Sequence, residues 1–176
     1  MRWDLANGEL GMAQQGVMAA EAFNSTAATS QFLTFLLGAE QYGVEILKVQ
    51  EIRGYSAVTP IPNTPSYIKG VINLRGTVVP VVDLRSKFSM ATAEYNKFTV
   101  IIVVTVGTKV TGLVVDAVSD VLDVPAAEMR VAPDLGARVD TRFIRGMATI
   151  GDQMTVLLDI DRLLSEDELV ALESLN

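Results

Sequence analysis

Hydrophobic residues in this chain form short runs rich in Val, Ile and Leu, separated by Gly, Pro and Asn. From Gln31 onward the clearest runs lie at residues 78–82, 99–106, 113–115 and 155–158. Runs of this length and composition, bounded by turn-forming residues, are typical of strands rather than helices. Their close spacing predicts an all-β fold, either a barrel or a sandwich.

The two ends of the chain have different patterns. Residues 1–29 are rich in Ala, Gln, Gly, Ser and Thr without a sustained period, which predicts a flexible N-terminal tail. Residues 165–168 are Ser-Glu-Asp-Glu, a capping box, and Leu follows at positions 169, 172 and 175. We therefore predict a short amphipathic C-terminal α-helix over residues 161–176.

An internal repeat organises the region between these ends. Residues 38–52 match residues 107–121 at an offset of 69, and residues 67–84 match residues 143–160 at an offset of 76. A unit of this size buries little apolar surface alone, so two copies are expected to fold together. The repeat predicts two small β-barrels packed side by side, the first over residues 30–88 and the second over residues 89–160.

Two segments of the first copy depart from the strand pattern. Three prolines within residues 58–65 predict a rigid, extended connection that cannot join a sheet. Between residues 44 and 52 the apolar spacing changes from two to three, so we expect a bulge or a single helical turn there.

The composition removes several classes of function. The 176 residues include no His and no Cys, which excludes Ser-His-Asp triads, Cys-His pairs, disulfides and the usual zinc sites. There are 14 basic and 21 acidic residues, giving a net charge of −7. Residues 159–176 carry −5 of this, whereas residues 30–158 are neutral. A neutral body without a basic stripe disfavours nucleic acid and anionic membranes as partners.

The sequence also carries predictions about location. The first residues, Met-Arg-Trp-Asp-Leu-Ala, lack the apolar stretch of a signal peptide. The longest apolar run, residues 98–106, is half the length that a membrane-spanning helix needs and is typical of a buried strand. We therefore expect a cytoplasmic protein without direct membrane insertion.

Asp83 and Asp159 occupy equivalent positions of the repeat and offer the one pattern that suggests catalysis. Two carboxylates brought together could serve as general acid and base in a hydrolase. Alternatively, each residue ends a strand and caps the following turn. The chain contains no Gly-rich phosphate loop and no pattern of metal ligands, so neither a cofactor nor a metal is expected.

Residues 73–76, Asn-Leu-Arg-Gly, predict a turn between two strands, with Asn and Gly supplying the unusual backbone angles. An arginine on a rigid turn is a good docking group, because its planar guanidinium binds carboxylates and carbonyls. The residues leave docking and a plain turn as alternatives for Arg75. In the docking interpretation, Arg75 and the irregular segment 44–52 border one groove.

Several motifs, taken in order, resemble the family of chemotaxis coupling proteins known as CheW. They lie at residues 35–53, 63–65, 68–76, 79–85 and 112–121, and the likeness extends over about 31–175. The resemblance implies two SH3-like five-stranded barrels without catalytic activity. It also implies an adaptor that joins the cytoplasmic tips of chemoreceptors to the histidine kinase CheA and supports the assembly of signalling arrays.

The resemblance further implies which residues make these contacts. The receptor-facing groove would contain Val49, Glu51, Gly70, Asn73, Arg75, Val121 and Gly146. The kinase contact would contain Lys69 and Val78, and a second kinase contact would lie near Asp134 and Leu135. Methyl-accepting chemoreceptors and the regulatory domain of CheA are therefore the expected partners, and receptor arrays at the membrane are the expected location.

Overall fold

A computed structural model describes residues 29–91, 94–130, 141–150, 152–164 and 168. The strands are β2 (Thr29–Leu37), β3 (Glu40–Glu45), β4 (Val49–Gly54), β5 (Ile68–Leu74), β6 (Thr77–Asp83), β7 (Val100–Val106), β8 (Lys109–Val115), β9 (Ala117–Pro125), β10 (Ile144–Ile150) and β11 (Gln153–Leu158). The helical elements are short: η1 (Ile46–Lys48), α2 (Leu84–Lys87), η2 (Ala126–Glu128), η3 (Thr141–Phe143) and η4 (Ile160–Arg162). The all-β prediction is confirmed.

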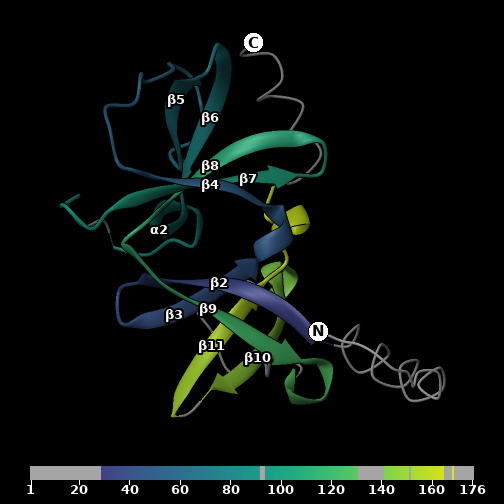
Figure 1. Cartoon of the computed structure of the whole chain (residues 1–176). Coiled ribbons are helices and arrows are strands. Elements are labelled where there is room, and N and C mark those ends of the chain that lie inside the picture. The colour runs from purple at the N-terminus through teal and green to yellow at the C-terminus, as the bar shows by residue number, and fades with distance from the viewer. Residues whose placement is uncertain (1–28, 92–93, 131–140, 151, 165–167, 169–176) are drawn as a thin grey trace, which may run out of the picture.

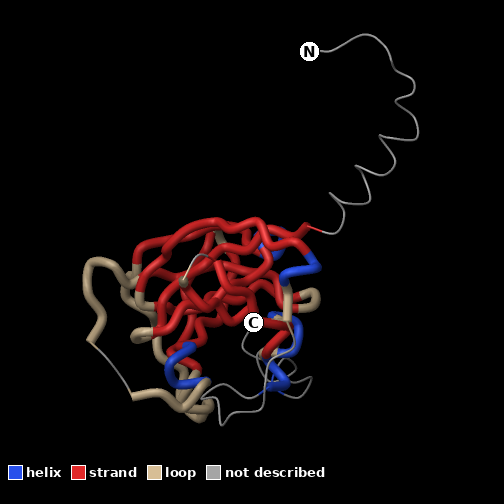
Figure 2. Tube along the Cα trace, turned by 90° about the horizontal axis from the view of Figure 1, so that it is seen from below, coloured by secondary structure: helices blue, strands red, loops and turns tan. Residues whose placement is uncertain are grey.

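The strands form two five-stranded sheets, which Figure 1 shows as a lower and an upper layer. Sheet 1 has the order β10-β11-β3-β2-β9, and sheet 2 has the order β4-β7-β8-β6-β5. Each sheet contains one parallel pair, β3 with β11 and β6 with β8, among antiparallel neighbours. The short helical turns lie at strand ends, around the rim of the strand layers (Figure 2). The predicted pair of five-stranded units is therefore confirmed.

The sheets do not follow the predicted division at residues 88 and 89. Sheet 1 combines the hairpin β2–β3 from the first copy of the repeat with β9, β10 and β11 from the second. Sheet 2 combines β4, β5 and β6 with the hairpin β7–β8 from the second copy. The reason is that β3 and β8 each find their parallel partner only in the other copy. The two copies have exchanged their first hairpins.

The strand register follows the repeat residue by residue. In sheet 1, Leu157 pairs with Gly43, and in sheet 2 Val81 pairs with Gly112. The offsets of 69 and 76 found in the sequence relate these two pairs, since Gly43 corresponds to Gly112 and Val81 to Leu157. The repeat is therefore a structural one, with equivalent positions making equivalent contacts in opposite sheets.

One hydrophobic cluster extends through both sheets. Phe35 and Tyr42 of sheet 1 stack at 6.0 Å between ring centroids, and Tyr42 contacts Phe88, which follows α2. The same buried cluster includes Ile102 and Leu113 of sheet 2. Burying side chains of this size is worth about 1.5–3 kcal/mol each. Because both sheets contribute to one core, we expect them to unfold in a single transition.

Each of two ion pairs joins the ends of neighbouring parallel strands in one sheet and accepts a backbone hydrogen bond from a hairpin turn of the other sheet. Arg85 of α2 donates to both carboxylate oxygens of Asp116, which lies between β8 and β9. The backbone N–H of Gly38, in the β2–β3 turn, donates to the same carboxylate at 2.7 Å. Lys48 of η1 pairs with Asp161 of η4 at 3.0 Å, beside the corresponding turn of β7 and β8. Both ion pairs stand where the chain crosses from one sheet to the other.

These carboxylates make folding sensitive to acid. Burial alone would raise the pKa of Asp116, but hydrogen bonds from Arg85 and Gly38 outweigh it and lower the pKa. The N–H of Gly107 and the ammonium of Lys48 lower the pKa of Asp161. A carboxylate with a lowered folded-state pKa stabilises the fold above its unfolded pKa of about 3.9, and this stabilisation is lost as pH falls further.

We therefore expect the thermal midpoint of unfolding to fall when the pH drops below about 4. Replacing Asp116 with Asn should remove part of that dependence, because the amide does not titrate. Thermal melts of both proteins between about pH 3 and pH 7 measure the difference. Parallel curves for Asp116→Asn and wild type would contradict the role given to this carboxylate.

Of the two predictions for segments of the first copy that depart from the strand pattern, one is confirmed and one is wrong at a single residue. The helical turn expected between residues 44 and 52 is confirmed as η1, and a bulge follows between Val49 and Glu51. The connection through residues 58–65 was expected to stay outside the sheets, which is wrong at one point: Thr59 exchanges two backbone hydrogen bonds with Val71. The three prolines all follow Thr59 in the chain, so the N–H and the carbonyl of Thr59 remain available and a single bridge can form.

The structure differs from the prediction at both ends of the chain and at one strand boundary. Thr29, expected in the tail, belongs to β2, and the rest of the predicted tail lies outside the described residues. The predicted C-terminal α-helix is not confirmed: it overlaps the 3-10 turn η4 at its start, and residues 165–167 and 169–176 lie outside the described residues. The apolar run at residues 98–106 forms β7 only from Val100, and Phe98 is 61% exposed rather than buried.

Candidate functional site

The turn between β5 and β6 presents Arg75 to solvent. Arg75 and Gly76 both have positive φ, 51° and 87°, as required in the two-residue loop of a tight hairpin. The side chain of Asn73 accepts a hydrogen bond from the Gly76 N–H at 2.8 Å, so Asn73 supports the turn without adopting the positive φ expected of it. The Arg75 side chain is 70% exposed. The turn therefore fixes the backbone and projects the guanidinium outward.

Glu51 of β4 holds the guanidinium of Arg75. The Nη1 atom of Arg75 lies 3.3 Å from Oε1 and 3.2 Å from Oε2 of Glu51. Because β4 and β5 are the two edges of sheet 2, this ion pair connects opposite edges of a curled sheet. An exposed pair of this kind adds about 0–1 kcal/mol of stability. Its main consequence is that Glu51 fixes the orientation of the Arg75 guanidinium, and both residues are predicted receptor contacts.

Two further predicted receptor residues, Val49 and Val121, lie on β4 and β9, the first strands after the chain crosses into sheet 2 and back into sheet 1. Val49, at the start of β4, is partly buried against the common core. Val121 of β9 is 44% exposed, and Ile52, its counterpart in the repeat, is 45% exposed. Ile52 was missed as a candidate, although the repeat offset that links it to Val121 is present in the sequence.

Gly70 and Gly146, also predicted at the receptor groove, are buried. A Cβ on Gly70 would lie 2.0 Å from the carbonyl oxygen of Thr59, and φ at Gly70 is +145°. At Gly146 a Cβ would lie 2.7 Å from Cγ of Met129 and 3.0 Å from the Arg130 carbonyl oxygen. Both glycines allow another segment to pack closely on a bulged strand. Their surroundings are backbone and core rather than exposed surface.

The predicted kinase residues share the β5–β6 hairpin with the receptor residues. Val78 of β6 is the register partner of Asn73. Cross-strand partners place their side chains on the same face of a sheet. The ammonium of Lys69 lies 5.3 Å from the ring centroid of Tyr95. Asp134 and Leu135, the predicted second contact, lie outside the described residues.

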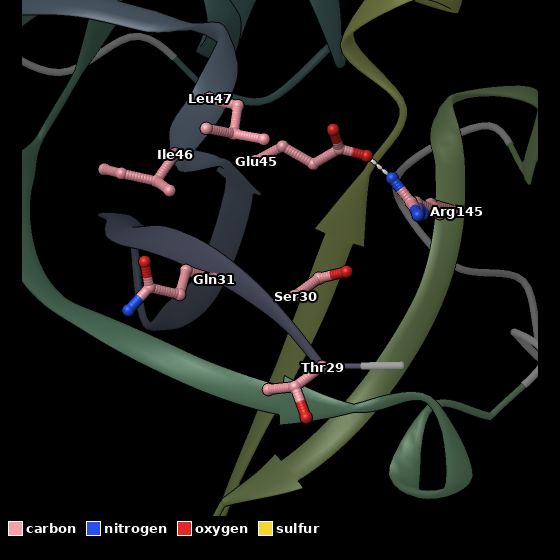
Figure 3. A pocket seen from close by; sticks show the side chains of 7 residues that line it. All are labelled: Thr29, Ser30, Gln31, Glu45, Ile46, Leu47 and Arg145. Atoms are coloured by element: carbon pink, nitrogen blue, oxygen red, sulfur yellow. Dashed lines mark ion pairs between the residues drawn. The ribbon is translucent and has the colours of Figure 1, made fainter. Parts of the chain in front are cut away.

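A groove next to η1 presents the most exposed large apolar side chain of the described residues, Leu47, which is 92% exposed. The groove has a volume of about 310 Å³ and is lined by Thr29, Ser30, Gln31, Glu45, Ile46, Leu47 and Arg145. Figure 3 shows Glu45 reaching Arg145 of β10 to form an ion pair, while Ile46 points to the opposite side of the turn. The change of apolar period near residue 46 was the sequence signal for this irregular segment, but it did not identify Leu47.

Comparison with known proteins decides the family. The family model described as the CheW-like domain matches residues 31–168. The chain belongs to the CheW-like domain family. It is 49% identical over 144 residues to a chemotaxis protein CheW of Klebsiella aerogenes, covering 82% of this chain and 87% of that protein. It is 39% identical over 138 residues to a chemotaxis protein CheW of Rhizobium meliloti, covering 78% and 89%.

A solved CheW structure has the same fold. The crystal structure of the scaffolding protein TtCheW from Thermoanaerobacter tengcongensis superposes on this CheW-like chain with a TM-score of 0.73 at 32% sequence identity. The superposition covers 79% of this chain and 90% of TtCheW. This chain therefore shares its fold with TtCheW.

In this CheW-like fold Asp83 and Asp159 are turn caps. Asp83 accepts hydrogen bonds from the Arg85 N–H at 2.9 Å and from the Tyr95 hydroxyl at 2.5 Å. Burial, with that bond to Asp83, raises the pKa of Tyr95 above its ordinary range. Asp159 accepts from the Asp161 N–H at 3.2 Å. Each carboxylate ends a strand of a different sheet, so the capping interpretation holds and nothing supports the hydrolase alternative.

No cluster of three or more acidic side chains among the described residues could hold a metal ion. Among the same residues, no helix has both the length and the apolar character needed to cross a membrane.

Proposed function

We propose that this chain is a non-catalytic chemotaxis adaptor that couples the cytoplasmic tips of chemoreceptors to the histidine kinase CheA. The observation that carries the proposal is the guanidinium of Arg75, held by Glu51 on an exposed turn, in a chain of the CheW-like family. Arginine on a rigid support is enriched at the centre of protein interfaces, because little side-chain entropy is lost when it docks.

The proposed receptor surface combines residues from four elements of the fold. These are Arg75 on the β5–β6 turn with Glu51 of β4, the exposed apolar residues Ile52 of β4 and Val121 of β9, and the exposed Leu47 of η1. Exposed apolar side chains with a charged group nearby are typical of protein docking surfaces. Val49 and Asn73 support this surface from the start of β4 and from the turn. Gly70 and Gly146 contribute through the backbone packing that they permit.

The proposed kinase surface includes Lys69 and Val78, with a second contact at Asp134 and Leu135. Val78 shares a hairpin face with Asn73. Receptor and kinase would therefore contact one rigid hairpin, which gives a short physical route between them. The partners are methyl-accepting receptors and the regulatory domain of CheA, met in the cytoplasm at membrane-associated arrays. The adaptor transmits a receptor change as a change in kinase activity through contacts alone.

Replacing Arg75 with Ala is expected to weaken binding of a chemoreceptor cytoplasmic fragment about tenfold, as for the truncation of an interfacial arginine. Binding of the CheA regulatory domain should stay within about twofold, because the fold is unchanged and truncation outside an interface has little effect. Titration calorimetry with each purified partner measures both. Kinase autophosphorylation with receptor-containing membranes tests the coupling itself.

Two control variants separate docking from stability. Arg75→Gly also removes the guanidinium but suits the positive φ of 51°, so it should weaken receptor binding while stabilising the turn. Arg162→Ala removes an arginine that is equally exposed, at 72%, and also paired with one carboxylate, Asp159 at 3.5 Å. Receptor binding should survive that change. Equal losses for Arg162→Ala and Arg75→Ala, or no loss for either, would refute the proposed surface.

A further inference from the structure

The two ion pairs at the crossovers are related by the internal repeat. The first, the Arg85 clasp, consists of Arg85, Asp116 and the N–H of Gly38. The second, the Lys48 clasp, consists of Lys48, Asp161 and the N–H of Gly107, which donates to Asp161 at 3.1 Å. In each clasp, one residue lies where the chain crosses between the sheets, Asp116 in the first and Lys48 in the second. Its partner lies on a short helix that follows a strand, Arg85 on α2 or Asp161 on η4. The backbone N–H of a glycine in a hairpin turn donates to the carboxylate.

The two clasps have opposite polarity. Gly38 corresponds to Gly107 by the offset of 69, and Arg85 corresponds to Asp161 by the offset of 76. The short helix thus supplies the cation in the Arg85 clasp and the anion in the Lys48 clasp. The counterpart of Asp116 on the first crossover is not Lys48 but the residue before it, Leu47.

The displacement by one residue coincides with a difference in exposure at position 47. On the second crossover, Asp116 uses its side chain to close the clasp and is only partly exposed. On the first crossover, Lys48 closes the clasp, and Leu47 at the equivalent position is 92% exposed. The segment is also fixed at its other end, where Glu45 pairs with Arg145. Leu47 therefore lies on a short turn that is held by an ion pair on each side, and Figure 3 shows Leu47 with the Glu45–Arg145 pair.

We infer that Lys48 and Asp161 are positioning residues: their ion pair fixes the η1 turn in the conformation that presents Leu47 to the receptor. The inference deepens the proposed function and rests on it, because it assigns the clasp to the receptor surface. A docking segment whose backbone is already fixed loses less conformational entropy on binding. The clasp is partly exposed, 33% at Lys48 and 47% at Asp161, so its effect falls on local order rather than on global stability.

The test compares four variants of the full chain: Lys48→Met, Asp161→Asn, the double variant, and Leu47→Ser. Each is titrated with a chemoreceptor cytoplasmic fragment and with the CheA regulatory domain. Lys48→Met and Asp161→Asn should each weaken receptor binding about threefold, and the double variant should be no weaker than either, since both break one interaction. Leu47→Ser should weaken it more, and kinase binding should not change.

Two controls accompany these variants. Lys48→Arg keeps the clasp and should bind the receptor fragment like the wild type. Asp152→Asn removes an exposed carboxylate from the β10–β11 turn and should have no effect. A methyl NMR spectrum of leucine-labelled protein adds a readout without any partner, the Leu47 signal being assigned by its loss in Leu47→Ser. Breaking the clasp should shift that signal, because the turn that carries Leu47 is released, and should leave the core leucine signals in place.

The outcomes are distinct. If Leu47→Ser binds the receptor fragment like the wild type, the proposed receptor surface is wrong at Leu47. If Leu47→Ser is weakened but the clasp variants are neutral, or if their losses add, the positioning role is wrong while the proposed function stands. An unchanged Leu47 methyl signal in Asp161→Asn would overturn the positioning role whether or not the fragment binds.

Discussion

Gly70→Ala is expected to lower the free energy of unfolding by about 3 kcal/mol or more. The added Cβ would lie 2.0 Å from the Thr59 carbonyl oxygen and 2.9 Å from Cγ1 of Val58, and φ at this position is +145°. The first contact is with backbone that is itself hydrogen-bonded to Val71, so it cannot turn aside as a flexible side chain could. Either the bridge between residues 59 and 71 breaks or the strand shifts.

Urea unfolding followed by circular dichroism measures this loss, and Gly54→Ala is its matched control. Gly54 lies on β4 in the same sheet, and a Cβ there would meet no atom within 4 Å. We expect that substitution to change stability by less than about 0.5 kcal/mol. Equal stability of the two variants would mean that the close approach at Gly70 is not rigid. Because a side chain at position 70 is expected to destabilise the fold, the stability of a Gly70→Asp variant should be measured before its receptor binding is interpreted.

Arg85→Ala is expected to lower the free energy of unfolding by about 2–3 kcal/mol. The Arg85 side chain is 16% exposed and makes three hydrogen bonds, two to Asp116 and one to the carbonyl of Ala91. Removing it leaves the Asp116 carboxylate with the Gly38 N–H but without its cation. A partly buried charge that loses its partner keeps the cost of desolvation.

The related position in the repeat supplies the comparison. Lys48→Met breaks the more exposed clasp and should cost at most about 1 kcal/mol. Because one core joins the sheets, Arg85→Ala should shift a single unfolding transition rather than split it in two. Two separate transitions, or a larger loss for Lys48→Met than for Arg85→Ala, would contradict the view that the Arg85 clasp is the stronger link between the sheets.

Local features of the fold could be predicted because each is determined by a few neighbouring residues. Alternating and continuous apolar runs indicate strands such as β6 and β8, and the loss of a two-residue period indicates the turn η1. The repeat offsets carry more: they predict the equivalence of Val81 with Leu157, which the strand register confirms. Arg75 was identified as a candidate because the turn requires only local chemistry.

The candidate site was harder to predict, because exposure depends on what packs nearby. Gly70 and Arg75 belong to one sequence motif, yet the structure buries the first beneath Thr59 and exposes the second. The same limitation applies to Leu47, a hydrophobic residue between strands that would ordinarily be assigned to the core. The turn that carries Leu47 is held by an ion pair between its neighbour Lys48 and a residue more than one hundred positions away, Asp161, which no local pattern reveals.

The sequence by itself determined the class of fold, the strands, the repeat, the absence of histidine and cysteine chemistry, and the resemblance that names the family. Only the tertiary structure decided that the copies exchange their hairpins, so that β3 pairs with β11 and β6 with β8. The physical reason is that either partner satisfies the local pattern equally well. A strand's periodicity specifies which face is buried, whereas the choice of partner depends on how the whole core closes.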